Sequence, residues 1–120
     1  MSTRAKARGS RGAVVNGGVR DIEQITRLGF PVFGEYRCVK DIRRRGFMAE
    51  FGIEINIGGV RVKPREIIFA DANGVVVIPS QYEDQIFFEL HKSLGGEKQT
   101  ESGLLSGKSA QELFEEFNTF

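Results

Sequence analysis

The chain has 120 residues, of which 40% are hydrophobic, so it is long enough for one ordinary domain and too short for two. Its 17 Lys and Arg residues against 16 Asp and Glu residues give a formal charge of +1, which excludes a strong overall attraction to nucleic acid or to an anionic membrane. One cysteine, Cys38, and one histidine, His91, exclude an internal disulfide and a zinc cluster. We find no apolar segment of membrane-spanning length and no secretory leader, and we expect a cytoplasmic location.

The beginning of the chain predicts a helix, a buried strand and a glycine turn in succession. Residues 2–8 contain good helix formers, and Gly9 is placed to end that helix. Residues 13–15 are small or β-branched and predict a short buried strand. The Asn-Gly-Gly sequence at 16–18 then predicts a turn with positive φ.

Arg20 and Asp21 follow this turn and are the candidate functional side chains. A guanidinium suits a carboxylate or a phosphate, and a carboxylate suits a hard cation such as Mg²⁺. Two structural roles compete with this interpretation. Asp21 and Gln24 have the form of a capping box for a helix that Gly29 ends, and Arg20 can be a solvated residue in a surface ion pair.

Residues 30–33 predict a strand entered through Pro31, and residues 34–46 predict a basic loop in which Asp41 is one of the few counter-charges. The cations of this loop are Arg37, Lys40, Arg43, Arg44 and Arg45. Such a run favours a solvated connection. Contact with an anionic substrate, with RNA or with an acidic subunit surface is the alternative.

Two β-hairpins are predicted next. Apolar residues alternate with polar ones on both sides of Gly58-Gly59, which predicts a two-residue hairpin with one apolar face. A second turn is predicted at residues 71–74, where Asp71 is a turn residue rather than a ligand. The continuous apolar run Val75–Ile78 predicts a strand buried on both faces.

The end of the chain predicts two helices joined by a linker. Ser80 and Glu83 have the form of a capping box for a helix that Gly95-Gly96 ends. Residues 97–108 predict the linker, and residues 109–120 predict an amphipathic helix whose apolar face is too large to leave in water. This face comprises Leu113, Phe114, Phe117 and Phe120. We expect the helix to pack on a neighbouring subunit or to fold back over the sheet.

Two ordered motifs resemble a known family. The stretch AxxRGxxGAVVNGGVRD, followed by a short helix and PVF, resembles the central motif of the RraA-like family, and GGVRVKPREIIFADANGVVVIP resembles its second signature. The resemblance implies an α/β (α+β) fold, the swivelling β/β/α sandwich or barrel of that family, with residues 1–96 as the C-terminal part of the domain and helices after it. Because the family carries further strands and a Gly-acid-Leu segment before the first motif, the resemblance also implies N-terminal truncation.

The resemblance implies a divalent-metal-dependent aldolase or decarboxylase that releases pyruvate from small 2-oxo acids, namely 4-hydroxy-4-methyl-2-oxoglutarate or oxaloacetate. By position, Arg20 and Asp21 would be the catalytic residues: Arg20, with Gly17 and Gly18, would bind the substrate, and Asp21 would hold Mg²⁺ or Mn²⁺. The family forms trimers, which implies a homo-oligomer. Members also bind and inhibit a ribonuclease complex, and this regulatory role is the alternative function. Direct contact with nucleic acid or with a membrane is not expected.

Overall fold

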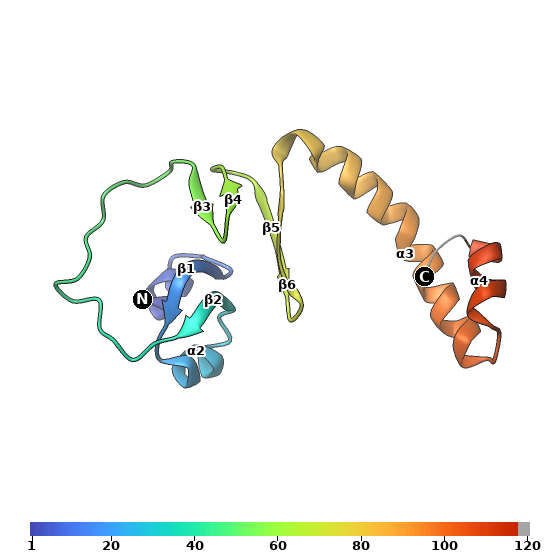
Figure 1. Cartoon of the computed structure of the whole chain (residues 1–120), viewed down its shortest axis with the longest axis horizontal. Helices are drawn as coiled ribbons and strands as arrows, with labels where there is room; N and C mark the ends of the chain where they lie inside the picture. Colours follow the sequence, from blue (N-terminus) through green and yellow to red (C-terminus); the bar gives the residue numbers. More distant parts are fainter. Residues whose placement is uncertain (118–120) are drawn as a thin grey trace. The chain divides into compact units, whose positions relative to one another are not determined.

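The computed structural model describes residues 1–117. The chain forms two compact units, Met1–Val77 and Ile78–Phe120. The first unit is built mainly from strands and the second from helices (Figure 1). This combination confirms the predicted α+β class. Within the described residues the strands make three two-stranded sheets, β1-β2, β3-β4 and β5-β6, and no closed barrel.

The first unit opens with a β-α-β arrangement that positions the candidate residues. Its elements are α1 (Ser2–Ala7), β1 (Ala13–Val19), α2 (Ile22–Leu28) and β2 (Val32–Arg37). The two strands pair in parallel, as strands joined by a crossover helix do. Both helices are confirmed, and Gly9 (φ 89°) and Gly29 (φ 60°) follow them in the left-handed conformation. The strand predicted at 30–33 begins and ends later, so the basic loop starts only at Cys38.

The turn predicted at residues 16–18 is wrong, because β1 runs through these residues without reversing. Val15 pairs with Gly34 and Gly18 pairs with Tyr36, so β1 contains one residue more than β2 in this interval. That extra residue makes a β-bulge, and Gly17 accommodates it with φ 146°. The Asn-Gly-Gly signal is therefore used for an irregularity inside a strand, because pairing with β2 keeps the chain extended.

The two predicted hairpins are confirmed. Their strands are β3 (Ile55–Ile57), β4 (Val60–Val62), β5 (Ile67–Asp71) and β6 (Gly74–Ile78). Gly58 (φ 57°) and Gly59 (φ 84°) form the first turn in the conformation that two-residue hairpins favour. At the second turn, Oδ1 of Asp71 accepts the amide of Asn73 at 2.8 Å, so Asp71 is the turn residue that the sequence predicts.

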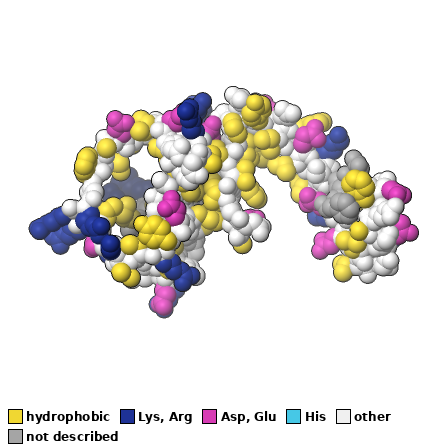
Figure 2. Space-filling model, viewed as in Figure 1, with side chains coloured by type: hydrophobic (Ala, Val, Ile, Leu, Met, Phe, Trp, Pro, Cys, Tyr) yellow, Lys and Arg dark blue, Asp and Glu magenta, His cyan; other side chains and the backbone are white. Residues whose placement is uncertain are grey.

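The strands of the first unit leave an apolar groove of about 1180 Å³, lined by residues from all six strands. Among the described residues of this unit, Phe30 is the one buried hydrophobic side chain. Val75 and Val76 are 39% and 58% exposed, so the prediction that Val75–Ile78 is buried on both faces is wrong. The reason is that no element among residues 1–117 covers both faces of β6. Figure 2 shows hydrophobic side chains, in yellow, open to solvent.

The second unit is a helical hairpin. One 3₁₀ turn, Ser80–Tyr82, leads into α3 (Glu83–Leu105), which is followed by α4 (Ala110–Phe117). The predicted capping box of Ser80 and Glu83 does not form, because the 3₁₀ turn places Tyr82 at the start of the helix. Among the described residues, no helix combines the length and hydropathy needed to cross a bilayer.

α3 continues through Gly95-Gly96, so the predicted helix end is wrong and the expected linker 97–108 is helical as far as Leu105. Glycine disfavours a helix, but packing against a neighbouring element outweighs propensity. Here Leu113 of α4 is completely buried, and it lies so close to Gly103 that a Cβ there would be 2.4 Å from its Cδ2. This contact holds the last turns of α3 in helical form.

α4 begins with the predicted cap. The amide of Ser109 donates to Oε2 of Glu112 at 2.8 Å, and the amide of Glu112 donates to Oγ of Ser109 at 3.2 Å. The helix packs on α3, its immediate predecessor, and its packing on a neighbouring subunit or over the sheet stays a prediction. Phe120, the last member of the predicted apolar face, lies outside the described residues.

Candidate functional site

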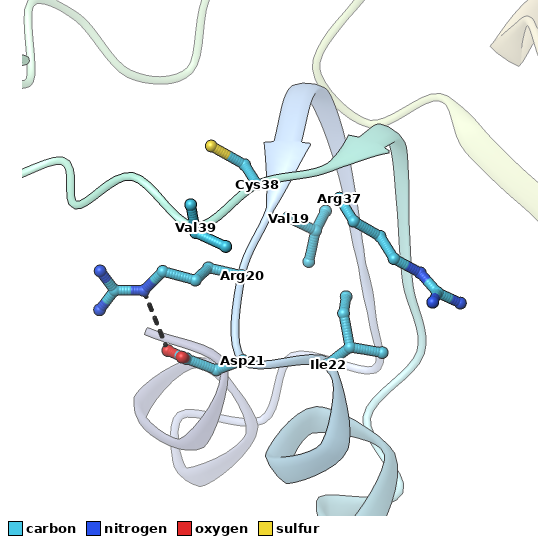
Figure 3. Close-up of a pocket in the computed structure, with 7 residues that line it drawn as sticks. All are labelled: Val19, Arg20, Asp21, Ile22, Arg37, Cys38 and Val39. Atoms are coloured by element: carbon cyan, nitrogen blue, oxygen red, sulfur yellow. Dashed lines mark hydrogen bonds and ion pairs between the residues drawn. The ribbon is translucent and has the colours of Figure 1, made fainter.

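Arg20 and Asp21 stand at the carboxyl end of β1, where the chain leaves the sheet for α2. Parallel strands bring their carboxyl ends to the same edge of a sheet, so the residues after β2 come to this edge as well. Nε of Arg20 lies 3.4 Å from Oδ2 of Asp21, a long hydrogen bond within an ion pair (Figure 3). The two predicted residues therefore lie side by side, with 43% and 54% of their side chains exposed.

The predicted capping box between Asp21 and Gln24 does not form. Asp21 is the N-cap residue of α2, but its side chain makes no capping hydrogen bond. Its backbone has φ 61° and ψ 38°, the left-handed region, whereas capping residues take an extended conformation. Left-handed non-glycine residues often occur at functional sites. The carboxylate consequently turns to Arg20 and leaves the helix amides, which removes the capping role of Asp21, whereas the surface ion pair expected as the alternative for Arg20 is present.

Asp41 is the residue of this site that the sequence did not single out. It lies in the loop between β2 and β3, and its Oδ2 is 3.3 Å from Nη1 of Arg20. Its other oxygen, Oδ1, accepts the amide of Arg43 at 2.8 Å. From the sequence, Asp41 was only a counter-charge in a basic run, because nothing local indicates that this loop returns to the end of β1. The carboxyl-edge rule for parallel strands is the signal that would have pointed to it.

Two carboxylates thus share one guanidinium. They raise the pKa of Arg20, first through the charge of Asp21 and then through the hydrogen bond with Asp41, so Arg20 stays protonated at any physiological pH. The pKa of Asp41 is lowered, mainly by the amide of Arg43 and then by Arg20. Asp41 is therefore an anion at neutral pH, and the site cannot use Arg20 as a proton acceptor.

A cavity of about 520 Å³ opens beside this pair. Its lining comprises Val19, Arg20, Asp21, Ile22, Arg37, Cys38 and Val39. In Figure 3 the guanidinium of Arg20 turns toward Asp21, whereas the guanidinium of Arg37 points away from both. The volume suits a small molecule. The lining therefore combines two arginines, of which Arg20 is the one paired with the carboxylate of Asp21, with four apolar side chains.

Gly17 and Gly18, which we expected beside the substrate, lie in the bulge and outside the lining of this cavity. A Cβ at Gly18 would be 2.5 Å from the Cβ of Cys38 and 2.7 Å from Cε2 of Tyr36. Glycine is thus required there by the close approach of β2 and the residue that follows it. Through this contact Gly18 sets the position of Cys38 at the cavity wall.

Asp21 offers a single carboxylate to a metal ion. Within residues 1–117, no three His, Cys, Asp or Glu side chains lie close enough together to hold one. Mg²⁺ is nevertheless often bound through one or two carboxylates, with water completing its shell. More than half of the Asp21 side chain is exposed, so this donor fits a largely hydrated hard cation.

Comparison with known proteins adds a family and a fold. A sequence model described as "RraA-like: Aldolase/RraA" matches residues 1–77. An uncharacterized protein of Methanocaldococcus jannaschii is 34% identical over 112 residues, which is 93% of this chain and 53% of that protein. A Halalkalibacterium halodurans protein named "Putative 4-hydroxy-4-methyl-2-oxoglutarate aldolase" is 31% identical over 100 residues, 83% of this chain and 47% of its own length.

A crystal structure of an uncharacterized protein from Pseudomonas syringae pv. tomato matches with a TM-score of 0.88 at 23% identity, covering 94% of this chain and 56% of that one. At this identity the likeness concerns the fold alone. The chain spans about half the length of the curated relatives it matches.

Proposed function

This chain belongs to the RraA-like family, and from that premise we propose that its Arg20–Asp21 site serves a divalent-metal-dependent lyase for small 2-oxo acids. The observation that carries the proposal is the adjacency of the two side chains at the wall of a cavity of small-molecule size. Further support comes from relatives whose names specify 4-hydroxy-4-methyl-2-oxoglutarate as the substrate of an aldolase.

Each residue has a distinct task in this proposal. Arg20 binds the carboxylate of the 2-oxo acid through its planar fork, and its raised pKa keeps the positive charge in place. Asp21 holds Mg²⁺ or Mn²⁺, whose chemistry when bound is to stabilise negative charge on the enolate oxygen of the pyruvate that leaves. The Asp21 carboxylate also contacts Nε of Arg20, which restricts the orientations that the guanidinium can take.

Pyruvate release by the full chain tests the proposal. The substrates are 4-hydroxy-4-methyl-2-oxoglutarate and oxaloacetate, with Mg²⁺, with Mn²⁺ and with EDTA, and the spontaneous decay of oxaloacetate in the same buffer is subtracted. We expect metal-dependent turnover, and a loss on the order of 10²–10³-fold in Arg20→Lys and Asp21→Asn, because Lys lacks the fork and Asn lacks the charge.

Arg27→Ala and Glu23→Gln are the matched controls. These residues form an ion pair on α2 with Nη2 and Oε2 3.3 Å apart and with side chains 81% and 86% exposed, so their loss should leave turnover unchanged. Turnover that does not need the metal, or that is absent from the full chain, would contradict the proposed function.

A further inference from the structure

We propose that Asp41 is an internal competitor for the anion site of Arg20: its carboxylate occupies the guanidinium that otherwise receives the carboxylate of a small acid. This inference rests on the proposed function, which assigns Arg20 to the substrate. The observation behind it is the contact of Oδ2 of Asp41 with Nη1 of Arg20 at 3.3 Å. Asp41 thus lowers the affinity of the site for a small acid by occupying the same nitrogen.

The loop between β2 and β3 holds Asp41 in the orientation that competition requires. Oδ1 is engaged by the amide of Arg43, which fixes one oxygen in a local turn, and Oδ2 faces Arg20. A bound acid would present its own oxygens to the same nitrogen. Two anions repel each other at contact distance, so the acid displaces Oδ2 of Asp41 or binds less tightly beside it.

The contact is weak enough to be displaced. The side chains of Arg20 and Asp41 are 43% and 60% exposed, and exposed ion pairs contribute little to stability. Asp21 contacts a different nitrogen of the guanidinium, Nε, so an acid that takes the place of Asp41 at Nη1 does not compete directly with it.

Displacement also has a consequence for the loop. Figure 2 shows Lys and Arg side chains, in dark blue, gathered on the long connection that follows β2. Asp41 ties this basic segment to the end of β1. Binding of an acid to Arg20 and release of Asp41 are linked, so an acid that binds Arg20 loosens the loop. By the same linkage, a partner that holds the loop against Arg20 lowers the affinity of Arg20 for the acid.

Asp41→Asn tests the inference, with Asp71→Asn as its matched control. Asparagine keeps an Oδ1 acceptor for the amide of residue 43 but removes the negative charge. Asp71 makes the same kind of turn, with Oδ1 2.8 Å from the amide nitrogen of Asn73, in the hairpin of β5 and β6. The probe is oxalate without added metal, and its dissociation constant is measured on the full chain from the NMR signal of the Arg20 Nε–H group.

Asp41→Asn should bind oxalate about two- to fivefold more tightly than the unmodified chain, the range that exposed ion pairs span, and Asp71→Asn should bind it equally. In the unmodified chain, oxalate should also shift the amide signals of residues 42–46, a result that needs no variant. Unchanged or weaker oxalate binding by Asp41→Asn, or no binding to either form, overturns the inference. Weaker binding would make Asp41 a residue that positions Arg20.

The turnover assay keeps this inference separate from the proposed function. Tighter oxalate binding by Asp41→Asn in a chain without lyase activity would support competition by Asp41 and refute the proposed lyase function. Metal-dependent turnover with unchanged oxalate affinity in Asp41→Asn would do the reverse.

Discussion

Gly34→Ala tests whether the packing of β1 against β2 supports the site. A Cβ at Gly34 would lie 2.4 Å from Cγ2 of Val19. Carbon atoms pack best about 3.5–4.0 Å apart, so Val19 would have to move by about 1 Å. Overpacking of this kind lowers the free energy of unfolding by about 1–3 kcal/mol. Because Val19 precedes Arg20 and lines the cavity, the shift should reach the site.

Val19→Ala supplies the matched rescue. It removes Cγ2 and leaves the Cβ of residue 19 at 3.7 Å from the new Cβ, an ordinary contact, while the backbone oxygen of Gly17 at 3.1 Å stays close, so the rescue is partial. By itself, Val19→Ala removes two methyl groups from a half-buried side chain, a loss of about 1 kcal/mol. The double variant should nevertheless be more stable than Gly34→Ala, although it carries one substitution more.

Urea unfolding of the full chain, followed by far-ultraviolet circular dichroism, measures all four free energies. We expect a favourable coupling energy of about 1–2 kcal/mol between the two substitutions. Strictly additive effects would mean that residues 19 and 34 do not touch. That result would refute the close approach of Val19 to Gly34 and, with it, the packing that we infer to support Arg20.

In the helical unit, Leu113→Ala should lower the free energy of unfolding by about 2–5 kcal/mol, because this side chain is completely buried. Urea titration measures the loss, and a change as small as that of Leu105→Ala, at a side chain 84% exposed, would contradict the packing of α4 on α3. The second expectation concerns pH. The amide of Ser109 lowers the pKa of Glu112 below its ordinary 4.5, so the stability from this cap is complete above pH 4.5 and is lost as the pH falls through the lower folded value. Glu112→Gln should flatten the dependence of helicity on pH below 4.5, Glu115→Gln should not, and equal profiles for both would disprove the cap.

Local signals in the sequence were enough for the elements that depend on neighbouring residues. The turn of Gly58-Gly59, the helix end at Gly29 and the reciprocal cap of Ser109 and Glu112 all follow from residue type and short spacing. Each of these features is decided within a few residues of chain. They are therefore visible before any tertiary contact is known.

The wrong predictions have the opposite character. Gly17 looked like part of a turn, but pairing with β2 keeps it in a strand. The glycines at 95–96 looked like a helix end, but α3 continues because Leu113 packs against its far end at Gly103. The Asp21 carboxylate does not cap α2, because it pairs with the neighbouring guanidinium of Arg20. In these three cases a contact with another segment or a neighbouring charge outweighed the local preference.

The candidate site divides in the same way. The adjacency of Arg20 and Asp21 is a property of the sequence, and the resemblance to a family drew attention to it. Asp41 reaches Arg20 only because β1 and β2 run parallel and the chain after β2 returns to the same edge. Twenty residues of intervening chain hide that relation from any local pattern.

The extra residue in β1 changes the side of the strand on which each later side chain lies. Side chains of a strand alternate between its two sides, so one added position exchanges the sides for every later residue. Removing Gly17 would restore regular pairing and send the arginine at the strand end to the opposite side, away from the carboxylate of Asp41. The number of residues in β1 therefore decides on which side of the sheet the Arg20 guanidinium lies. A related sequence that lacks the residue at position 17 should carry its arginine on the other side.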